Sequence, residues 1–189
     1  MVIGVLALQG NFDSHIKILN KINLKHKLVK KARDLISLHG LIIPGGESTT
    51  ITNLLKRNQS LIDGINEFSK HKPILGSCAG LILMSKESND SRVHNFGFLD
   101  IVTSRNAYGR QVHSFEAPIQ VKNDVIFSEI NVLFIRAPKV NKVNKGVEIL
   151  ATFQEEIVGV RQGKHIGISC HPELLDETLI HEICFKGKE

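Results

Sequence analysis

A cysteine flanked by small residues stands where two apolar segments meet. An apolar run ending at Leu75 leads into Gly76-Ser77-Cys78-Ala79-Gly80, and a second apolar run begins at Leu81. This G-x-C-x-G pattern is the cysteine form of a nucleophile elbow, a strained strand-to-helix turn that exposes its central side chain. The start of a helix favours a thiolate, and the N–H of Ala79 is placed to donate to an oxyanion. We therefore predict that Cys78 is a nucleophile, the alternative being a buried structural cysteine.

A base for this thiol stands near the carboxyl end of the chain. Of nine histidines, His171 is favoured because it follows the last predicted strand, at the edge where α/β sheets place catalytic groups. Residues i and i+2 of an extended chain point the same way, and Pro172 favours extended backbone at His171, so Glu173 can orient the imidazole. The same alternation turns Cys170 away, which makes it a buried apolar residue rather than a metal ligand. The predicted order of nucleophile, base and orienting carboxylate is Cys78, His171, Glu173.

The composition is that of an ordinary globular protein. The chain has 189 residues, of which 42% are hydrophobic and 23% charged, which argues against disorder and predicts a single domain over residues 1–189. Three cysteines fit neither a disulfide framework nor a CxxC zinc pattern. The amino terminus lacks the basic region of a signal peptide, and no apolar run approaches the roughly 18 residues of a membrane span. We expect a cytoplasmic protein with free thiols, no membrane segment and no metal.

The net charge of +5 raises the question of nucleic-acid binding. One segment carries much of the bias, since no acidic residue lies between Asp13 and Asp34. No known nucleic-acid-binding motif accompanies it, and the chain has no Trp and one Tyr for base stacking, so we expect no nucleic-acid partner. A solvated basic face is favoured, with a docking face for an acidic protein as the alternative. The basic segment comprises Lys17, Lys21, Lys25, Lys27, Lys30, Lys31 and Arg33.

In the first half of the chain, short apolar runs typical of strands alternate with segments whose apolar residues recur at helical spacing. This order predicts a parallel α/β sheet with helices on both faces. After about Phe96, short apolar segments with short connections predict strands that add antiparallel or mixed pairing to the same sheet. The predicted strands are Val2–Leu8, His26–Lys30, Leu41–Ile43, Pro73–Gly76, Gly97–Thr103, Phe115–Val121, Val132–Ile135, Val147–Phe153, Ile157–Gln162 and Ile166–Ser169. The predicted helices are Phe12–Ile22, a segment from a Ser48 or Thr49 cap to Leu55, Leu61–Phe68, Ala79–Met84 and Leu174–Phe185.

Taken with these elements, the chain resembles the class I glutamine amidotransferases, which have a three-layer, flavodoxin-like α/β fold with a mixed, mostly parallel sheet. Within that family it is similar to the glutaminase subunits of pyridoxal 5'-phosphate synthase. The triad alone would fit any member of the class, whereas the full set of motifs is specific and extends from end to end of the chain. These motifs are Leu6–Gly10, Ile43–Thr50, Gly76–Gly80, Arg105–Gln111, Phe134–Pro138 and His171–Leu174.

The resemblance implies roles for individual residues. Cys78, His171 and Glu173 match the family's triad, and the backbone N–H groups of Gly46 and Ala79 match its oxyanion hole. A Gly-Gly turn exposes N–H groups without side-chain cover, and an arginine can bind a carboxylate through two hydrogen bonds. The alternative for each arginine is an ordinary surface or ion-pair residue. The residues that match glutamine-binding positions are Gly46, Glu47, Ser48, Arg105, Ile135 and Arg136.

The implied reaction is hydrolysis of L-glutamine to glutamate and ammonia, with no cofactor or metal. Because ammonia is mostly protonated at neutral pH, the resemblance also implies a separate (β/α)8-barrel synthase subunit that receives ammonia through a channel. Pyridoxal 5'-phosphate is then the product of the complex. The sequence departs from the family's usual pattern at Ser77, at Cys170, at Ala107-Tyr108 and at Asn11-Phe12-Asp13, and the last departure falls where the family meets the synthase.

Three other functions stay open on the residues alone. The first is an elbow-cysteine hydrolase or stress protein, against which the Gly46-Glu47-Ser48 turn and the His171–Glu173 ending argue. The second is a non-catalytic docking module, which would have no need of an intact triad. The third is the same chemistry with another acceptor synthase, as in histidine biosynthesis, and the partner and its product would decide between them.

Overall fold

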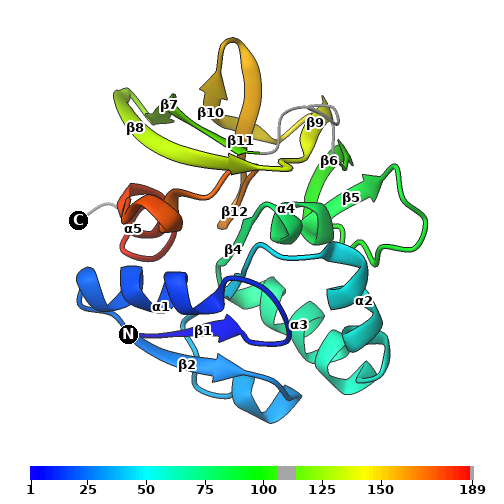
Figure 1. Ribbon diagram of the computed structural model, residues 1–189. Coiled ribbons are helices and arrows are strands. Elements are labelled where there is room, and N and C mark those ends of the chain that lie inside the picture. Colours follow the sequence, from blue (N-terminus) through cyan, green and yellow to red (C-terminus); the bar gives the residue numbers. More distant parts are fainter. Residues whose placement is uncertain (106–113, 188–189) are drawn as a thin grey trace.

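The structure, a computed structural model, describes residues 1–105 and 114–187 (Figure 1). The departure at Ala107-Tyr108 and most of the Arg105–Gln111 motif lie outside these residues. The strands are β1 (Val2–Leu6), β2 (Lys25–Val29), β3 (Gly40–Ile43), β4 (Ile74–Ser77), β5 (Ser85–Ser88), β6 (Leu99–Ser104), β7 (Ser114–Asn123), β8 (Ile126–Ile135), β9 (Lys139–Val143), β10 (Glu148–Phe153), β11 (Glu156–Gln162) and β12 (His165–Ile168). The α-helices are α1 (Phe12–Lys21), α2 (Ser48–Lys56), α3 (Gln59–His71), α4 (Ala79–Met84) and α5 (Leu179–Phe185), and the 3-10 helices are η1 (Ala32–Leu35) and η2 (Pro172–Leu175).

Nine strands form one mixed sheet, in the order β2-β1-β3-β4-β12-β11-β10-β7-β8. Pairing is parallel from β2 across to β12 and antiparallel from β12 across to β8. The predicted α/β fold with a mixed sheet is confirmed. The antiparallel share is larger than "mostly parallel" implies, because β7–β8 and β10–β11–β12 are joined by short hairpin turns, which force antiparallel pairing.

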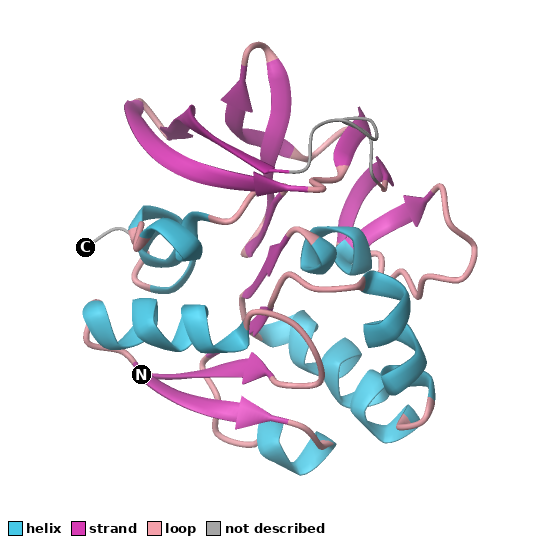
Figure 2. Cartoon of the chain, viewed as in Figure 1, coloured by secondary structure: helices cyan, strands magenta, loops and turns pink. Residues whose placement is uncertain are grey.

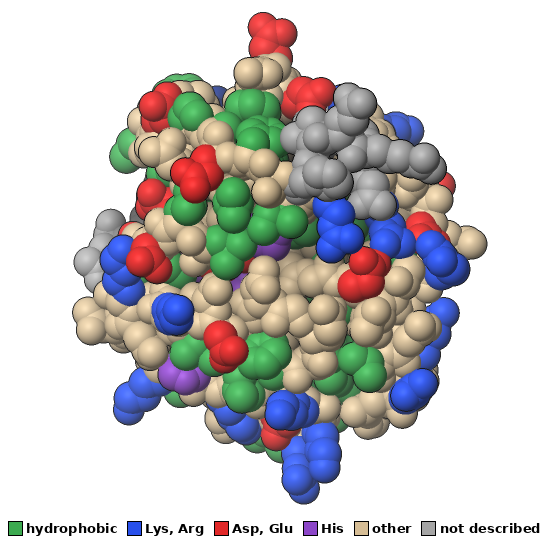
Figure 3. Space-filling model, viewed as in Figure 1, with side chains coloured by type: hydrophobic (Ala, Val, Ile, Leu, Met, Phe, Trp, Pro, Cys, Tyr) green, Lys and Arg blue, Asp and Glu red, His purple; other side chains and the backbone are tan. Residues whose placement is uncertain are grey.

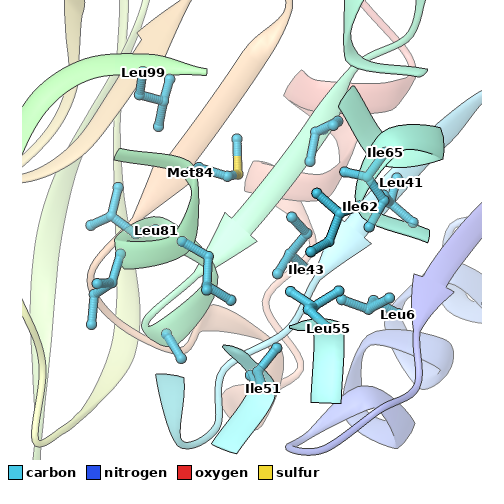
Figure 4. Packing of buried hydrophobic residues seen from close by; sticks show 14 of the residues in the cluster. Leu6, Leu41, Ile43, Ile51, Leu55, Ile62, Ile65, Leu81, Met84 and Leu99 are labelled. Atoms are coloured by element: carbon cyan, nitrogen blue, oxygen red, sulfur yellow. The ribbon is translucent and has the colours of Figure 1, made fainter. Parts of the chain in front are cut away.

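Helices cover both faces of the parallel half of the sheet, as predicted (Figure 2). Alternate residues of β3 divide between the two cores, since strand side chains point in turn to opposite faces. Leu41 and Ile43 pack with residues of α2, α3 and α4, including Leu55 (Figure 4). Ile42 packs instead with residues of α1 and α5, including Leu19 and Ile180. Two aliphatic cores therefore hold the parallel strands, and the positions of their carboxyl ends, from both sides.

A second, three-stranded sheet of β5, β6 and β9 corrects one expectation. The strand predicted over Gly97–Thr103 is present as β6, but it pairs with β5 and β9 and does not join the main sheet. Neither β5 nor β9 was predicted from the sequence. Each buries only one side chain, Ser85 in β5 and Val140 in β9, so neither has the apolar alternation that marks a strand.

The last predicted helix, Leu174–Phe185, is divided in two. The 3-10 helix η2 ends at Leu175, and α5 begins at Leu179. Asp176 between them has a left-handed backbone with φ 57°, which ends a helix. The side chain of Lys21 on α1 donates to the Asp176 carbonyl over 2.8 Å. Within the described part of the chain, none of the helices combines the length and the apolar character that a membrane crossing requires.

The basic segment lies on α1, β2 and η1, and all seven of its basic side chains are exposed. Strand β2 is an edge of the main sheet, and four of its five residues are exposed, among them Lys25 and Lys27. Figure 3 shows Lys and Arg side chains along the lower edge of the molecule, where β2 and η1 lie in Figure 1. Lysines on an edge strand oppose pairing with another chain, which supports a solvated face.

Candidate active site

Four neighbouring parallel strands, β1, β3, β4 and β12, bring the predicted site residues to one edge of the sheet. The chain leaves their carboxyl ends through Gln9-Gly10, Gly45-Gly46, Cys78 and His171, the edge at which open α/β sheets bind ligands. Backbones approach closely here. Gly10 has φ 110°, its neighbour Asn11 donates to the Gly45 carbonyl over 2.9 Å, and a side chain at Gly10 would clash with that carbonyl.

Cys78 occupies a strained turn between β4 and α4. Its φ of 49° and ψ of −103° lie outside the regions that non-glycine residues favour, and such strain persists only where the surroundings enforce it. The Cys78 N–H donates to the Ile168 carbonyl of β12 over 2.8 Å, and a side chain at Gly80 would clash with the Ile43 carbonyl. Helix α4 begins at Ala79, so the Ala79 N–H belongs to the first turn, which has no intrahelical acceptor. This is the strand–turn–helix geometry that the motif predicts.

His171 and Glu173 form a buried pair. Nδ1 of His171 lies 2.7 Å from Oε1 of Glu173, and the two residues are 3% and 2% exposed. The backbone of His171 is fixed by β8, since its N–H donates to the Leu133 carbonyl over 2.8 Å. The predicted contact is present, but it does not arise from a continuous extended segment. His171, with φ −120° and ψ 81°, lies just outside the extended region, and Glu173 already lies in η2.

The ring of His171 faces the cysteine across Gly45. A side chain at Gly45 would clash with Cε1 of His171 and would lie 3.3 Å from Cβ of Cys78, so both residues border the same glycine. Burial of His171 opposes protonation, but the side chains of Cys78 and Glu173 outweigh it and raise the pKa of His171 to about 10. The imidazole is thereby held protonated at neutral pH, in the form that can donate a proton.

A cavity of about 250 Å³ opens beside the thiol. Cys78 is 8% exposed, and its Sγ lies 3.9 Å from the Ile135 carbonyl. Glu173 is buried behind the imidazole and does not line the cavity. Every other predicted site residue does, namely Cys78, His171, Gly46, Ala79, Glu47, Ser48, Arg105, Ile135 and Arg136.

The polar side chains at the cavity differ in whether they already form ion pairs or hydrogen bonds within the chain. The guanidinium of Arg105 forms ion pairs with both Glu47 and Asp90. Arg136 is exposed, has φ 43°, and has no ion-pair partner among the described residues. Ser48 was predicted as a possible helix cap, but Glu47 is the N-cap residue. The Ser48 hydroxyl is buried and finds no hydrogen-bond partner in the described chain.

Three further side chains line the cavity that were not assigned to the site from the sequence, namely Gln9, Asn11 and Ile82. Gln9 lines the cavity, and its Oε1 accepts the Glu47 N–H over 2.8 Å, which ties the end of β1 to the Gly46-Glu47 turn. Its position directly after the first strand is the signal that could have found it. Ile82 of α4 contributes an apolar wall. It carries no sequence signal, because every residue of α4 is buried and Ile82 looks like any other apolar residue of that helix.

The two remaining cysteines lie away from the cavity. Cys170 is fully buried in the core beneath α1 and α5, and burial raises the pKa of its thiol. Cys184 lies on α5 and packs against the same core. All three cysteines are free. Cys78 is therefore the thiol that a ligand in the cavity would meet.

Comparison with known proteins gives a consistent result. The curated proteins called "Pyridoxal 5'-phosphate synthase subunit PdxT" from Oenococcus oeni and Shouchella clausii are 46% and 44% identical to the chain. They match over 97% and 98% of it, and over 95% and 94% of their own lengths. A solved structure described as "Crystal structure of glutamine amidotransferase" superposes with a TM-score of 0.91 at 37% identity, covering 98% of both chains.

A more distant structure, PurLQS from Thermotoga maritima, has a TM-score of 0.68 at 18% identity, covers 98% of this chain and 93% of its own, and shares the fold. The family model described as "SNO glutamine amidotransferase family" matches residues 5–186. The match runs from β1 to the end of α5 and so contains the whole of the site. The chain belongs to the SNO glutamine amidotransferase family.

Proposed function

We propose that the chain is the glutaminase subunit of a pyridoxal 5'-phosphate synthase and that Cys78, His171 and Glu173 are its triad. The observation that carries the proposal is the placement of Cys78 on a strained turn at the cavity, opposite an imidazole that Glu173 holds at 2.7 Å. Nucleophile, base and orienting carboxylate are the three parts that acyl transfer through a cysteine requires. The names of the relatives support the pathway, and the description of the family supports glutamine as the substrate.

In the first half of the reaction the Cys78 thiolate attacks the side-chain amide carbon of glutamine. Negative charge moves to the amide oxygen, and in this proposal the N–H groups of Gly46 and Ala79 donate hydrogen bonds to that oxygen. His171 donates its proton to the departing nitrogen, so the C–N bond breaks, ammonia leaves and a γ-glutamyl thioester stays on Cys78. The raised pKa of His171 suits this step, because a proton is present on the ring at neutral pH.

In the second half water takes the place of ammonia. His171, now neutral, removes a proton from water as the oxygen attacks the thioester carbon, and the C–S bond breaks to release glutamate and the thiolate. Glu173 fixes the ring throughout, since its Oε1 accepts from Nδ1 and leaves Nε2 for the reacting groups.

Three groups at the cavity are suited to hold glutamine. The guanidinium of Arg136, which has no ion-pair partner among the described residues, can bind the α-carboxylate. The Ser48 hydroxyl, which is buried without a hydrogen-bond partner in the same part of the chain, can meet a polar group of the substrate. Arg105 is already engaged by Glu47 and Asp90, so its contribution is to hold the Glu47 side chain at the wall of the cavity. The Ile135 carbonyl completes the site near the thiol.

The proposal also includes a partner and a compartment. Ammonia must reach its acceptor unprotonated, so we place a separate (β/α)8-barrel synthase subunit against this chain, with a channel between the two sites. We place the complex in the cytoplasm, where reducing conditions keep Cys78 a thiol.

The test is ammonia release from glutamine, measured with and without a candidate synthase subunit. Cys78→Ala should lower the rate with synthase by at least about 10³-fold, as loss of a triad nucleophile does, and should abolish labelling by a diazo-ketone glutamine analogue. Cys184→Ala, a matched change on α5, should leave both unchanged. Release of ammonia by Cys78→Ala at the wild-type rate would refute the proposal, and a product other than pyridoxal 5'-phosphate would change the acceptor.

A further inference from the structure

A second buried imidazole approaches the same oxygen of the triad carboxylate that His171 contacts. His15 on α1 is fully buried, and its Nε2 lies 3.6 Å from Glu173 Oε1 and 3.1 Å from Ser77 Oγ. Its Nδ1 lies 2.9 Å from Nε2 of His181 on α5, which is also fully buried. The carboxylate of Glu173 thus lies between two imidazoles, only one of which takes part in the reaction.

The charge of Glu173 favours one tautomer of His15. If Nε2 carries the proton, the N–H faces the carboxylate and the Ser77 hydroxyl oxygen. If Nδ1 carries it, the Nε2 lone pair faces a negative oxygen at 3.6 Å, which is repulsive. The Ser77 hydroxyl oxygen is compatible with the first arrangement, because it has two lone pairs and can accept from His15 as well as from the Gly45 N–H.

His181 favours the same tautomer from the other end. Its Nδ1 is buried and has no hydrogen-bond partner among the described residues. When His15 Nδ1 is the acceptor, His181 donates from Nε2, and its Nδ1 holds only an unused lone pair. The reverse arrangement would bury an N–H of His181 without an acceptor, which costs more free energy than burying a lone pair without a donor.

We propose that His15 is a positioning residue for the triad: its Nε2–H, which donates to Ser77 Oγ, also faces Oε1 of Glu173 and stabilises the negative charge on the oxygen that accepts from His171, and His181 fixes the tautomer of His15. The inference rests on the proposed function, because it assigns His15 a role through Glu173. His15 touches neither the cavity nor the thiol, and it acts on the reaction only through the orientation and charge of the carboxylate.

The same contacts tie His15 to the turn beside the thiol. Ser77 directly precedes Cys78, and its Oγ accepts the Gly45 N–H over 3.1 Å as well as facing His15. Burial lowers the pKa of His15 and lowers that of His181 to about 3, so both rings are neutral at neutral pH and each has a single N–H. Burial opposes ionisation of Glu173, but the facing imidazoles His15 and His171 outweigh it and lower its pKa to about 2.

The kinetic test compares two replacements of His15 in the complex with synthase. His15→Leu removes the donor, whereas His15→Gln places an amide N–H near the position of Nε2. We expect kcat to fall about 10- to 100-fold in His15→Leu, the range typical of a supporting carboxylate–histidine contact, with KM nearly unchanged and the acid limb of the pH–rate profile moved to higher pH. His15→Gln should restore most of the lost kcat and should return the acid limb most of the way to its wild-type position. His165→Leu, which replaces a half-buried histidine at the opposite end of β12, should change neither kcat nor the pH–rate profile.

Wild-type kcat in His15→Leu, or equal losses in the Leu and Gln variants with an unmoved acid limb, would overturn the inference. A second measurement covers the case in which a variant fails to fold. Long-range ¹H–¹⁵N NMR of the histidine-labelled wild-type chain should show His15 neutral with the proton on Nε2, and a proton on Nδ1 would overturn the inference. Neither readout is the one that tests the proposed function, which fails if Cys78→Ala keeps releasing ammonia.

Discussion

His171 Nδ1 and Glu173 Oε1 lie 2.7 Å apart, although His171 is the N-cap residue of the 3-10 helix η2 and Glu173 lies within that helix. The pair is local in sequence, but its surroundings are not. Strand β8 holds the backbone of His171, and α1 supplies His15, whose Nε2 lies 3.6 Å from the same oxygen of Glu173. The geometry of the base therefore depends on segments from both ends of the chain.

Replacing Glu173 with Gln should lower kcat by about 10²- to 10⁴-fold, the size of effect expected when the carboxylate of a triad is neutralised. An amide keeps an acceptor near Nδ1 but removes the charge that helps raise the pKa of His171. The His171 pKa, followed by NMR titration, should fall from about 10, and kcat is measured with synthase. Glu148→Gln, an exposed change on β10, is the control. An unchanged His171 titration would contradict this account.

Adding one methyl group at Gly45 should disable the site without unfolding the protein. The new Cβ would clash with Cε1 of His171, so the ring must leave its position beside Cys78. We expect kcat to fall at least about 100-fold, because misplacing a reacting group by about 1 Å has effects of that size. The Gly64→Ala variant adds the same methyl in α3 against the flexible end of Leu35 and should keep full activity. Equal kinetics for the two variants would show that His171 does not need the space.

Removing the guanidinium of Arg136 should act on substrate binding. Arg136→Gln is expected to raise KM for glutamine about 10- to 100-fold with a smaller change in kcat, since a charged hydrogen bond to a carboxylate is worth roughly 1.5–3 kcal/mol. Steady-state kinetics with synthase measures this. The matched change Arg92→Gln removes an exposed arginine whose partner is Asp90 and should leave KM unaltered. A fall in kcat with an unchanged KM would contradict this prediction and would show that Arg136 acts in the chemical step rather than in substrate binding.

Stability should fall on both sides of neutral pH. The pKa values of buried His15 and His181 lie below 6.5, so the unfolded chain takes up protons first as pH drops below 6.5. Glu173, with its pKa lowered to about 2, adds a loss from about pH 4.5 toward pH 2. The pKa of His171 is raised to about 10, so its contribution is complete below 6.5 and is lost as pH rises through 10.

Calorimetry from pH 3 to 10 should therefore show the highest Tm near pH 6–7. His181→Gln retains a donor toward His15 without a titrating ring, and its Tm should depend less steeply on pH below 6.5. A Tm that stays level from pH 6.5 to 4 would mean that neither buried imidazole resists protonation.

The basic segment should act as a solvated edge rather than a docking surface. Replacing Lys25 and Lys27 with Val is expected to promote aggregation, because it makes the edge strand β2 apolar. Replacing both with Gln should leave the affinity for the synthase unchanged at low salt, as measured by calorimetric titration. A salt-dependent loss of affinity in the Gln variant would favour the docking interpretation instead.

The sequence by itself determined the parts of this protein that local pattern encodes. The elbow around Cys78 needs small residues within one turn, and the strands of the parallel half are short apolar runs between clear breaks, so both can be read locally. His171 and Glu173 are two residues apart, which predicted their contact, although the extended backbone assumed for Glu173 is a 3-10 helix in the structure. The end-to-end motifs placed Gly46, Glu47, Ser48, Arg105, Ile135 and Arg136 at one cavity, where the structure also puts them.

Tertiary structure alone decided the features that depend on partners distant along the chain. Strands β5 and β9 form with little apolar alternation because β6 supplies their pairing, and the break at Asp176 divides a helix that periodicity made continuous. Arg105 is engaged by Glu47 and Asp90, which are 58 and 15 residues away. His15 and His181 meet across 166 residues. No local pattern distinguishes such a pair from two ordinary buried histidines, because only the packing of α1 against α5 and η2 brings their ring nitrogens to the carboxylate.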